Sequence, residues 1–205
     1  MTTRLMSGWG LKFFDYDNDG DLDLFLANGH PDDRIEERYS QVKYKEPMLL
    51  FKNTGKGFQN VSDTAGPVFT QSFAARGMAI GDFNNDGAVD VLVSVNNAAP
   101  VLLKNNAGKQ NHWLGVRLIG KTANPDAVGA LITYQAGDLK RHRFKVGGGS
   151  YLSSHDPREV LGLGPHAKVD SLDIKWPQPS GKTEHFTGLA ADRYITIVEG
   201  QGIKA

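Results

Sequence analysis

Eight of the 17 aspartates in this 205-residue chain lie in two nine-residue windows. Residues 15–23 read Asp-Tyr-Asp-Asn-Asp-Gly-Asp-Leu-Asp, and residues 82–90 read Asp-Phe-Asn-Asn-Asp-Gly-Ala-Val-Asp. Side-chain oxygens at positions 1, 3 and 5, a glycine at position 6 and a carbonyl at position 7 describe a loop that wraps around Ca²⁺. Without a cation, so many neighbouring carboxylates would repel one another and raise their pKa values. The two windows therefore predict two calcium sites.

We expect the ligands to occupy positions 1, 3, 5, 7 and 9 of each window. They are Asp15, Asp17, Asp19, Asp21 and Asp23 in the first loop and Asp82, Asn84, Asp86, Ala88 and Asp90 in the second. An EF-hand is excluded because its position 12 must be glutamate, and here it is Leu26 or Val93. Magnesium fits less well because it prefers octahedral geometry with retained waters. Solvent-exposed Asp/Asn-rich turns without a metal are the alternative.

An internal repeat predicts β-strands on both sides of each loop. Residues 10–24 align with residues 77–91, and residues 50–53 resemble residues 102–105. Apolar residues occupy every second position after both windows, as in half-buried strands. A repeat of more than about 40 residues, built from short strands, is typical of a propeller blade. The first copy has an additional polar segment, residues 30–46, which we expect to be a surface loop with a short helical stretch in residues 32–41.

The second half of the chain has a different pattern. After a polar linker at residues 105–111, strand-like runs without aspartate loops occupy residues 112–119, 128–136, 139–146, 169–176 and 194–199. Several short strands separated by turn signals indicate a β-sandwich or an open barrel. The chain is therefore predicted to be all-β, with two calcium-loop propeller blades in residues 1–110 and a β-sandwich-like domain in residues 111–205.

The loops and their flanks resemble FG-GAP/VCBS repeats, the calcium-loop blades of integrin-type β-propellers. The second half resembles an ASPIC/UnbV domain in residues 111–114, 148–151, 163–164, 175–177 and 180–181. This combination is similar to the cartilage acidic protein family. One departure is the segment Asn124–Ala127, because relatives usually carry a glycine after the aspartate. A propeller needs about four to eight blades to close, so the resemblance implies further N-terminal blades or a partner chain.

Three weaker signals have structural alternatives. Ser154-His155-Asp156 contains the residue types of a hydrolytic triad, but sequence neighbours on an extended chain point to opposite sides, which favours a polar turn. The basic strip Lys140, Arg141, Arg143 and Lys145 would suit an acidic polymer such as a sulfated glycan, or it protects a solvated edge strand. We expect Trp113 and Trp176 to fill the core of the second domain.

Composition narrows the classes of function. The chain has 23 basic and 23 acidic side chains, without the positive bias of a nucleic-acid-binding domain. No apolar run is long enough to cross a bilayer, and the absence of cysteine excludes disulfides, a thiolate zinc site and a cysteine nucleophile. The sequence predicts a calcium-binding, non-catalytic binding module, secreted to an extracellular or periplasmic compartment. The resemblance to integrin-like and cartilage proteins implies adhesion, with an extracellular protein or glycan as the partner. An accessory or catalytic role in natural-product biosynthesis, suggested by the UnbV resemblance, is the alternative.

Overall fold

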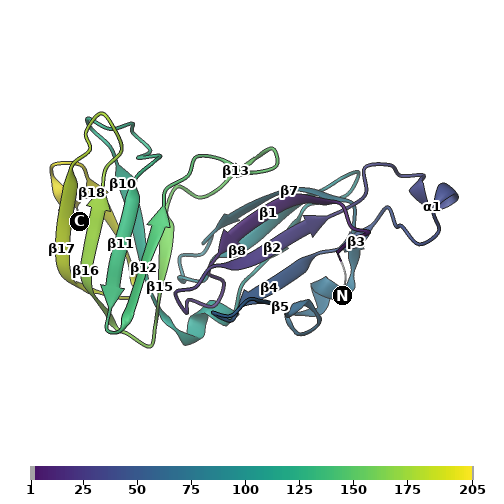
Figure 1. Ribbon diagram of the computed structural model, residues 1–205, viewed down its shortest axis with the longest axis horizontal. Coiled ribbons are helices and arrows are strands. Elements are labelled where there is room, and N and C mark those ends of the chain that lie inside the picture. Colours follow the sequence, from purple (N-terminus) through teal and green to yellow (C-terminus); the bar gives the residue numbers. More distant parts are fainter. Residues whose placement is uncertain (1–2, 205) are drawn as a thin grey trace.

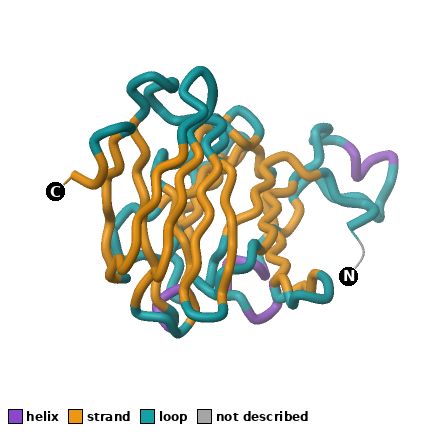
Figure 2. The backbone as a smooth tube through the Cα atoms, turned by 60° about the vertical axis from the view of Figure 1, so that its left-hand side comes forward, coloured by secondary structure: helices purple, strands orange, loops and turns teal. Residues whose placement is uncertain are grey.

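The computed structural model describes residues 3–204, and these residues form an all-β structure (Figures 1 and 2). The strands gather into an N-terminal half (residues 3–106) and a C-terminal half (residues 112–204). The helical segments are short: α1 (Ile35–Arg38) and the 3₁₀ helices η1 (Ser62–Thr64), η2 (Pro67–Thr70) and η3 (Ala107–Gln110). The all-β prediction is confirmed, and α1 lies in the additional polar segment. None of the described helices has the length and apolar character needed to span a membrane.

The N-terminal half contains two antiparallel sheets that share one buried apolar cluster. The first sheet comprises β1 (Gly8–Phe14), β2 (Asp23–Asn28), β4 (Leu49–Asn53) and β5 (Phe58–Asn60), in that order. The second comprises β7 (Ala75–Gly81), β8 (Asp90–Val95) and β9 (Val101–Leu103). A short pair, β3 (Glu46–Pro47) and β6 (Ser72–Phe73), lies beside them. Phe25, Met48 and Met78 belong to this buried cluster. The alternating valines Val91 and Val93 of β8 are buried as expected, whereas in β2 the buried positions are those between the alternating leucines.

Each sheet places an aspartate window between its first two strands. The first window connects β1 to β2, and the second connects β7 to β8. Strands β1 and β7 approach each other closely at Gly10. A Cβ at this position would lie only 2.7 Å from Cγ of Met78 on β7, so the approach requires glycine. The sheets formed by the described residues do not close into a propeller ring.

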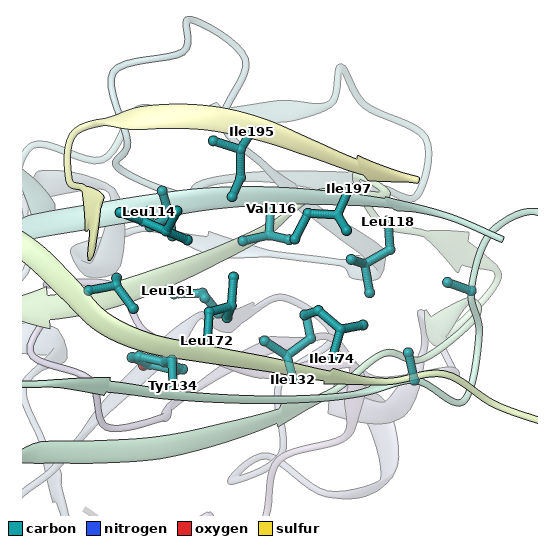
Figure 3. Packing of buried hydrophobic residues seen from close by; sticks show 14 of the residues in the cluster. Leu114, Val116, Leu118, Ile132, Tyr134, Leu161, Leu172, Ile174, Ile195 and Ile197 are labelled. Atoms are coloured by element: carbon teal, nitrogen blue, oxygen red, sulfur yellow. The ribbon is translucent and has the colours of Figure 1, made fainter. Parts of the chain in front are cut away.

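The C-terminal half contains two four-stranded sheets packed face to face. One has the order β15 (Glu159–Gly164), β10 (His112–Ile119), β18 (Arg193–Val198) and β19 (Gly202–Lys204). The other has the order β12 (Leu139–Phe144), β11 (Leu131–Ala136), β16 (Lys168–Lys175) and β17 (Thr183–Ala190). Figure 3 shows their facing side chains, among them Leu114, Val116, Ile132 and Leu172, which are fully buried. Trp176 belongs to this core, as expected.

A hairpin connects the two halves at their upper side in Figure 1. Its strands are β13 (Gly149–Ser150) and β14 (Ser153–Ser154), and it extends from the C-terminal half over β1 and β7. The backbone N–H of Leu11 donates a 3.1 Å hydrogen bond to Oγ of Ser150. The Tyr151 ring also lies edge-on to Trp9, with ring centroids 4.8 Å apart. The hairpin is therefore a polar and aromatic contact between parts of the chain that are far apart in sequence.

Candidate metal centre

The backbone of the first aspartate loop is held by its own position-1 carboxylate. Asp15 accepts hydrogen bonds from the backbone N–H groups of Asp19 (3.1 Å) and Gly20 (2.8 Å). Between them the chain turns sharply, with φ of 58° at Asn18 and 92° at Gly20. Asparagine and glycine adopt this left-handed region most readily. The sequence Asp-Asn-Asp-Gly therefore folds the loop so that its other carboxylates point toward Asp15.

The second loop repeats this geometry. Asp82 accepts hydrogen bonds from the backbone N–H groups of Asp86 (3.1 Å) and Gly87 (2.7 Å). The φ values of Asn85 and Gly87 are 58° and 83°. The two loops therefore have one backbone conformation, even though their side chains at positions 3 and 7 differ.

The position-9 aspartates fix the end of each loop to the neighbouring strand. Asp23 accepts hydrogen bonds from the backbone N–H groups of Tyr16 (3.3 Å) and Asn53 (2.8 Å). In the same way, Asp90 accepts them from Phe83 (3.2 Å) and Asn105 (2.8 Å). The sequence analysis did not assign a role to the two asparagines. The resemblance of residues 50–53 to residues 102–105 is the signal that could have found them.

Three carboxylates of the first loop converge. One ligand oxygen each from Asp15, Asp17 and Asp19 lies within 4.8 Å of the other two. Oδ1 of Asp17 is buried and has no hydrogen-bond partner. Burial raises the pKa of Asp15 to about 8, although the guanidinium of Arg143 lowers it, and burial raises that of Asp23 to about 7. An orphaned buried oxygen among crowded carboxylates fits a hard divalent cation held by oxygen ligands.

A lysine supplies part of the positive charge at this cluster. Nζ of Lys52 forms ion pairs with Asp17 and with Asp19, the latter at 3.2 Å. Burial lowers the pKa of Lys52, but its hydrogen bonds to Asp17 and Asp19 raise it above the ordinary value overall. Lys52 was not among the predicted site residues. A cation bound at the cluster would compete with this ammonium group for the same two carboxylates.

The Asp21 side chain faces away from the cluster. Its Oδ1 lies 3.0 Å from Nε of Arg141, in the C-terminal half. Position 7 of such a loop contributes a backbone carbonyl, so this ion pair leaves the expected contribution of Asp21 unchanged.

The second loop has fewer carboxylates available as metal ligands. Among the described residues, only the first loop brings three carboxylates within 4.8 Å. Nδ2 of Asn84 donates a 2.9 Å hydrogen bond to Asp86, and Nζ of Lys109 lies 3.0 Å from the same carboxylate. Ala88 is buried, and only its carbonyl could serve as a ligand.

The C-terminal half packs directly on the first loop. Nη2 of Arg143 donates a 3.0 Å hydrogen bond to the carbonyl of Gly20 and lies 3.7 Å from Oδ2 of Asp15. The backbone N–H of Gly164 donates to the carbonyl of Asn18 at 2.9 Å. The basic strip predicted from sequence is therefore not one continuous free surface: Arg141 and Arg143 contact the first loop, whereas Lys140 is exposed on β12, which is an edge strand. Arg143 is buried against the loop, and Lys145 is buried as well.

The second loop has equivalent contacts with the C-terminal half. The Tyr194 hydroxyl donates a 2.6 Å hydrogen bond to Oδ2 of Asp82. Nη2 of Arg158 donates to the carbonyl of Asp82 at 2.8 Å. Trp113 packs on this loop, and a Cβ on Gly87 would lie only 1.9 Å from its ring. The expectation that Trp113 fills the core of the second domain is therefore wrong, because its ring covers a loop of the other half.

The Ser154-His155-Asp156 segment does not form a triad. Nδ1 of His155 accepts a 3.2 Å hydrogen bond from the backbone N–H of Ile80. Asp156 is held by Arg158, at 2.6 Å between Oδ2 and Nη2. The segment is instead part of the contact between the two halves.

Comparison with known proteins follows the same division of the chain. Residues 15–93 match the FG-GAP-like repeat, and residues 120–204 match the ASPIC and UnbV family. The chain thus joins a segment similar to an FG-GAP-like repeat to a segment similar to an ASPIC and UnbV domain. The FG-GAP-like match contains both aspartate loops, so the contacts described above join the two matched regions.

The curated relatives carry one name. Cartilage acidic protein 1 of Xenopus tropicalis is 29% identical over 192 residues, which cover 90% of this chain and 27% of that protein. The proteins of the same name from Mus musculus and Homo sapiens are each 27% identical over 171 residues, 80% of this chain and 24% of theirs. The chain thus spans about a quarter of the length of the curated relatives it matches.

Proposed function

We propose that this chain is a calcium-binding, non-catalytic binding module in which Ca²⁺ stabilises the aspartate loops of two propeller-type blades. The observation that carries the proposal is the convergence of Asp15, Asp17 and Asp19 around a buried, unpartnered oxygen. The FG-GAP-like match over the same residues supports it. The ion would hold the loop and neutralise its charge, with Asp23 completing the ligands of the first site. The second loop would bind more weakly, because Asn84 and Ala88 replace carboxylates.

A calcium-rich compartment, extracellular or periplasmic, suits such sites. For a dissociation constant of about 10⁻⁴ M, typical of extracellular modules, about 1 mM calcium would add roughly 1.4 kcal/mol of stability per site. The relatives are named for cartilage, which is consistent with an extracellular role in protein or glycan binding. Further blades or a partner chain would complete the propeller.

Melting curves in EDTA and in 1 mM calcium test the proposal. We expect calcium to raise the melting temperature by several degrees, and magnesium at the same concentration to raise it less. Asp19→Asn and Asp86→Asn should each reduce the rise. Asp33→Asn is the matched control, because Asp33 is an exposed aspartate outside both loops. A folded protein whose melting temperature is the same in calcium and EDTA would overturn the calcium assignment.

A further inference from the structure

A cavity of about 640 Å³ lies between the two halves, beside the aspartate loops. Its walls come from the ends of β1 and β7 and, in the C-terminal half, from β12 and the segment 154–160. Cavities of this size hold small organic ligands in many proteins. Asp15 and Asp82, the first residues of the two loops, also line it, but the other predicted metal ligands do not.

Two ammonium groups lie on the wall, and only one of them has a carboxylate partner. Lys145 is only 4% exposed, and its Nζ lies 3.3 Å from Oε1 of Glu159. Lys12 is half-buried and makes no hydrogen bond or ion pair with the described residues. Burial lowers its pKa, Glu159 raises it and Lys145 lowers it further. An anion that binds beside a half-buried cation without a partner stabilises that cation, so its binding is favoured.

A hydrogen-bond donor lies next to Lys12. Because Nδ1 of His155 accepts from the backbone N–H of Ile80, the neutral ring carries its proton on Nε2. That nitrogen is buried, and although the backbone of Gly149 lies beside it, the two complete no hydrogen bond. A Cβ on Gly149 would lie 3.1 Å from Nε2 of His155 and 3.2 Å from Nζ of Lys12. The two nitrogens are therefore on the same side of Gly149.

Most of the other charged groups on the wall already have partners. Asp15 and Asp82 accept backbone N–H groups of their own loops. Asp156 accepts hydrogen bonds from Nε of Arg158 through both of its oxygens, each at 3.0 Å. Asp126 is exposed at the rim. His142 is also exposed on the wall, and like Asp126 its side chain forms no hydrogen bond or ion pair with the described residues. The ammonium of Lys12 is the unpaired cation next to Nε2 of His155.

Apolar side chains surround the charged part of the cavity. Phe13, Val128, Phe144 and Val146 all line it, and their exposed fractions are 45%, 40%, 61% and 41%. A single exposed apolar residue is ordinary. Four around one cavity that also has convergent polar groups are typical of a ligand site.

We propose that this cavity binds a small amphipathic carboxylic acid. The carboxylate would contact Lys12 and His155, with Lys145 behind them, and the hydrocarbon part would lie against Phe13 and Phe144. The ammonium group of Lys12, which has no direct partner among the described residues, suits a single negative charge. The proposal does not rest on calcium, because none of these groups belongs to the predicted metal ligands.

Isothermal titration calorimetry of the full chain with 4-phenylbutyrate tests the site. We expect 4-phenylbutyrate to bind at least about tenfold more tightly than 4-phenylbutan-1-ol, which lacks the charge. Lys12→Gln should weaken binding of the acid by at least about tenfold and leave binding of the alcohol unchanged. Phe144→Ala, at an exposed position that carries little fold stability, should weaken both. Lys56→Gln is the control, since Lys56 is exposed in the turn before β5.

Several results would overturn the proposal. They are no heat of binding for the acid at millimolar concentration, equal affinity for acid and alcohol, or an unchanged affinity in a folded Lys12→Gln variant. Titrations in calcium and in EDTA separate this proposal from the calcium assignment. Binding of the acid in EDTA would support the cavity even if calcium has no effect on the melting temperature.

Discussion

The hydroxyl of Tyr194, on β18, donates a 2.6 Å hydrogen bond to Oδ2 of Asp82, the first residue of the second aspartate loop. Asp82 is 1% exposed, so water cannot readily solvate its carboxylate. The C-terminal half supplies a hydrogen-bond donor in place of water. Burial and this hydrogen bond both raise the pKa of Tyr194, which therefore donates at all physiological pH values. The loop that could bind a metal is thus also a loop on which the second half rests.

Removing this hydroxyl should destabilise the protein. Tyr194→Phe keeps the ring against Trp113 but leaves Oδ2 of Asp82 with one fewer donor. We expect the free energy of unfolding in urea to fall by about 1–3 kcal/mol, the cost of leaving a buried acceptor short of a partner. Tyr39→Phe, at a residue that is 55% exposed, is the control and should change little. Equal stability of the Tyr194 variant and the native protein would show that the contact contributes nothing.

Stability without calcium should fall as the pH rises from 6.5 to 8. Burial raises the pKa of Asp15 to about 8, far above the ordinary 3.8. The folded state therefore holds a proton that the unfolded state has released, and the stability this gives is lost as the pH rises through the folded pKa. Urea midpoints in EDTA at pH 6.5 and 8 measure the effect. Asp15→Asn should reduce it, and the remainder would come from Asp23, whose pKa burial raises to about 7.

Calcium should reverse that trend. Metal ligands must be deprotonated to bind, so the stabilisation by 1 mM calcium should grow between pH 6.5 and 8. A calcium effect that shrinks over this range would contradict the assignment of Asp15 as a ligand.

A methyl group at Gly162 should disturb the contact between the halves. Its Cβ would lie 2.1 Å from Oδ2 of Asp15 and 2.6 Å from the backbone carbon of Asn18. Overpacking of this kind costs about 1–3 kcal/mol or more, so we expect Gly162→Ala to lower the urea midpoint clearly. Gly8→Ala is the matched control, because its Cβ would find only ordinary contacts, the nearest at 3.5 Å. Similar midpoints for the two variants would show that the halves separate at little cost.

Glu199 should stabilise the C-terminal half by capping a turn. Its Oε2 accepts hydrogen bonds from the backbone N–H groups of Lys121 (2.7 Å), Thr122 (2.8 Å) and Ala123 (2.9 Å). Burial raises the pKa of Glu199, but these hydrogen bonds lower it to about 2 overall. We expect Glu199→Gln to lower the free energy of unfolding at pH 7 by about 1–3 kcal/mol.

The pH dependence of this contribution has a definite sign. A depressed pKa gives stability that is present above the ordinary value of about 4.5 and is lost as the pH falls toward 2. Urea titrations from pH 7 to 3 should therefore show the native protein approaching the Glu199→Gln variant. A constant difference at all pH values would indicate that packing, and not charge, is the cause.

Local patterns in the sequence predict many of the observed strands. The strand predicted for residues 112–119 is β10, and the runs at 169–176 and 194–199 differ from β16 and β18 by one residue at each end. Strands β15 and β17 were not predicted. Glu159–Gly164 is interrupted by glycines, and Thr183–Ala190 lies at a sheet edge where few of its side chains are buried, so neither has a clear alternation.

The aspartate loops could also be predicted from the sequence, but the residues that pack around them could not. Spacing and turn residues predict that Asp15, Asp17 and Asp19 converge, because all the interactions are local. That Arg143 reaches Gly20 depends on a contact between residues 123 positions apart, and no local pattern encodes it. The basic strip was visible as one strand face, but what that face contacts could be learned only from the packing of the two halves.

These contacts make the linker at residues 105–111 almost redundant as a tether. Three donors beyond Lys109 reach the aspartate loops: Asn111 donates to the carbonyl of Asp17 (2.8 Å), Arg143 to that of Gly20 (3.0 Å) and Tyr194 to the side chain of Asp82 (2.6 Å). The two halves thus contact each other at several separate points: at both aspartate loops, at the hairpin and at the linker. If the chain were cleaved after Lys109, the two fragments would accordingly stay associated through non-covalent contacts alone.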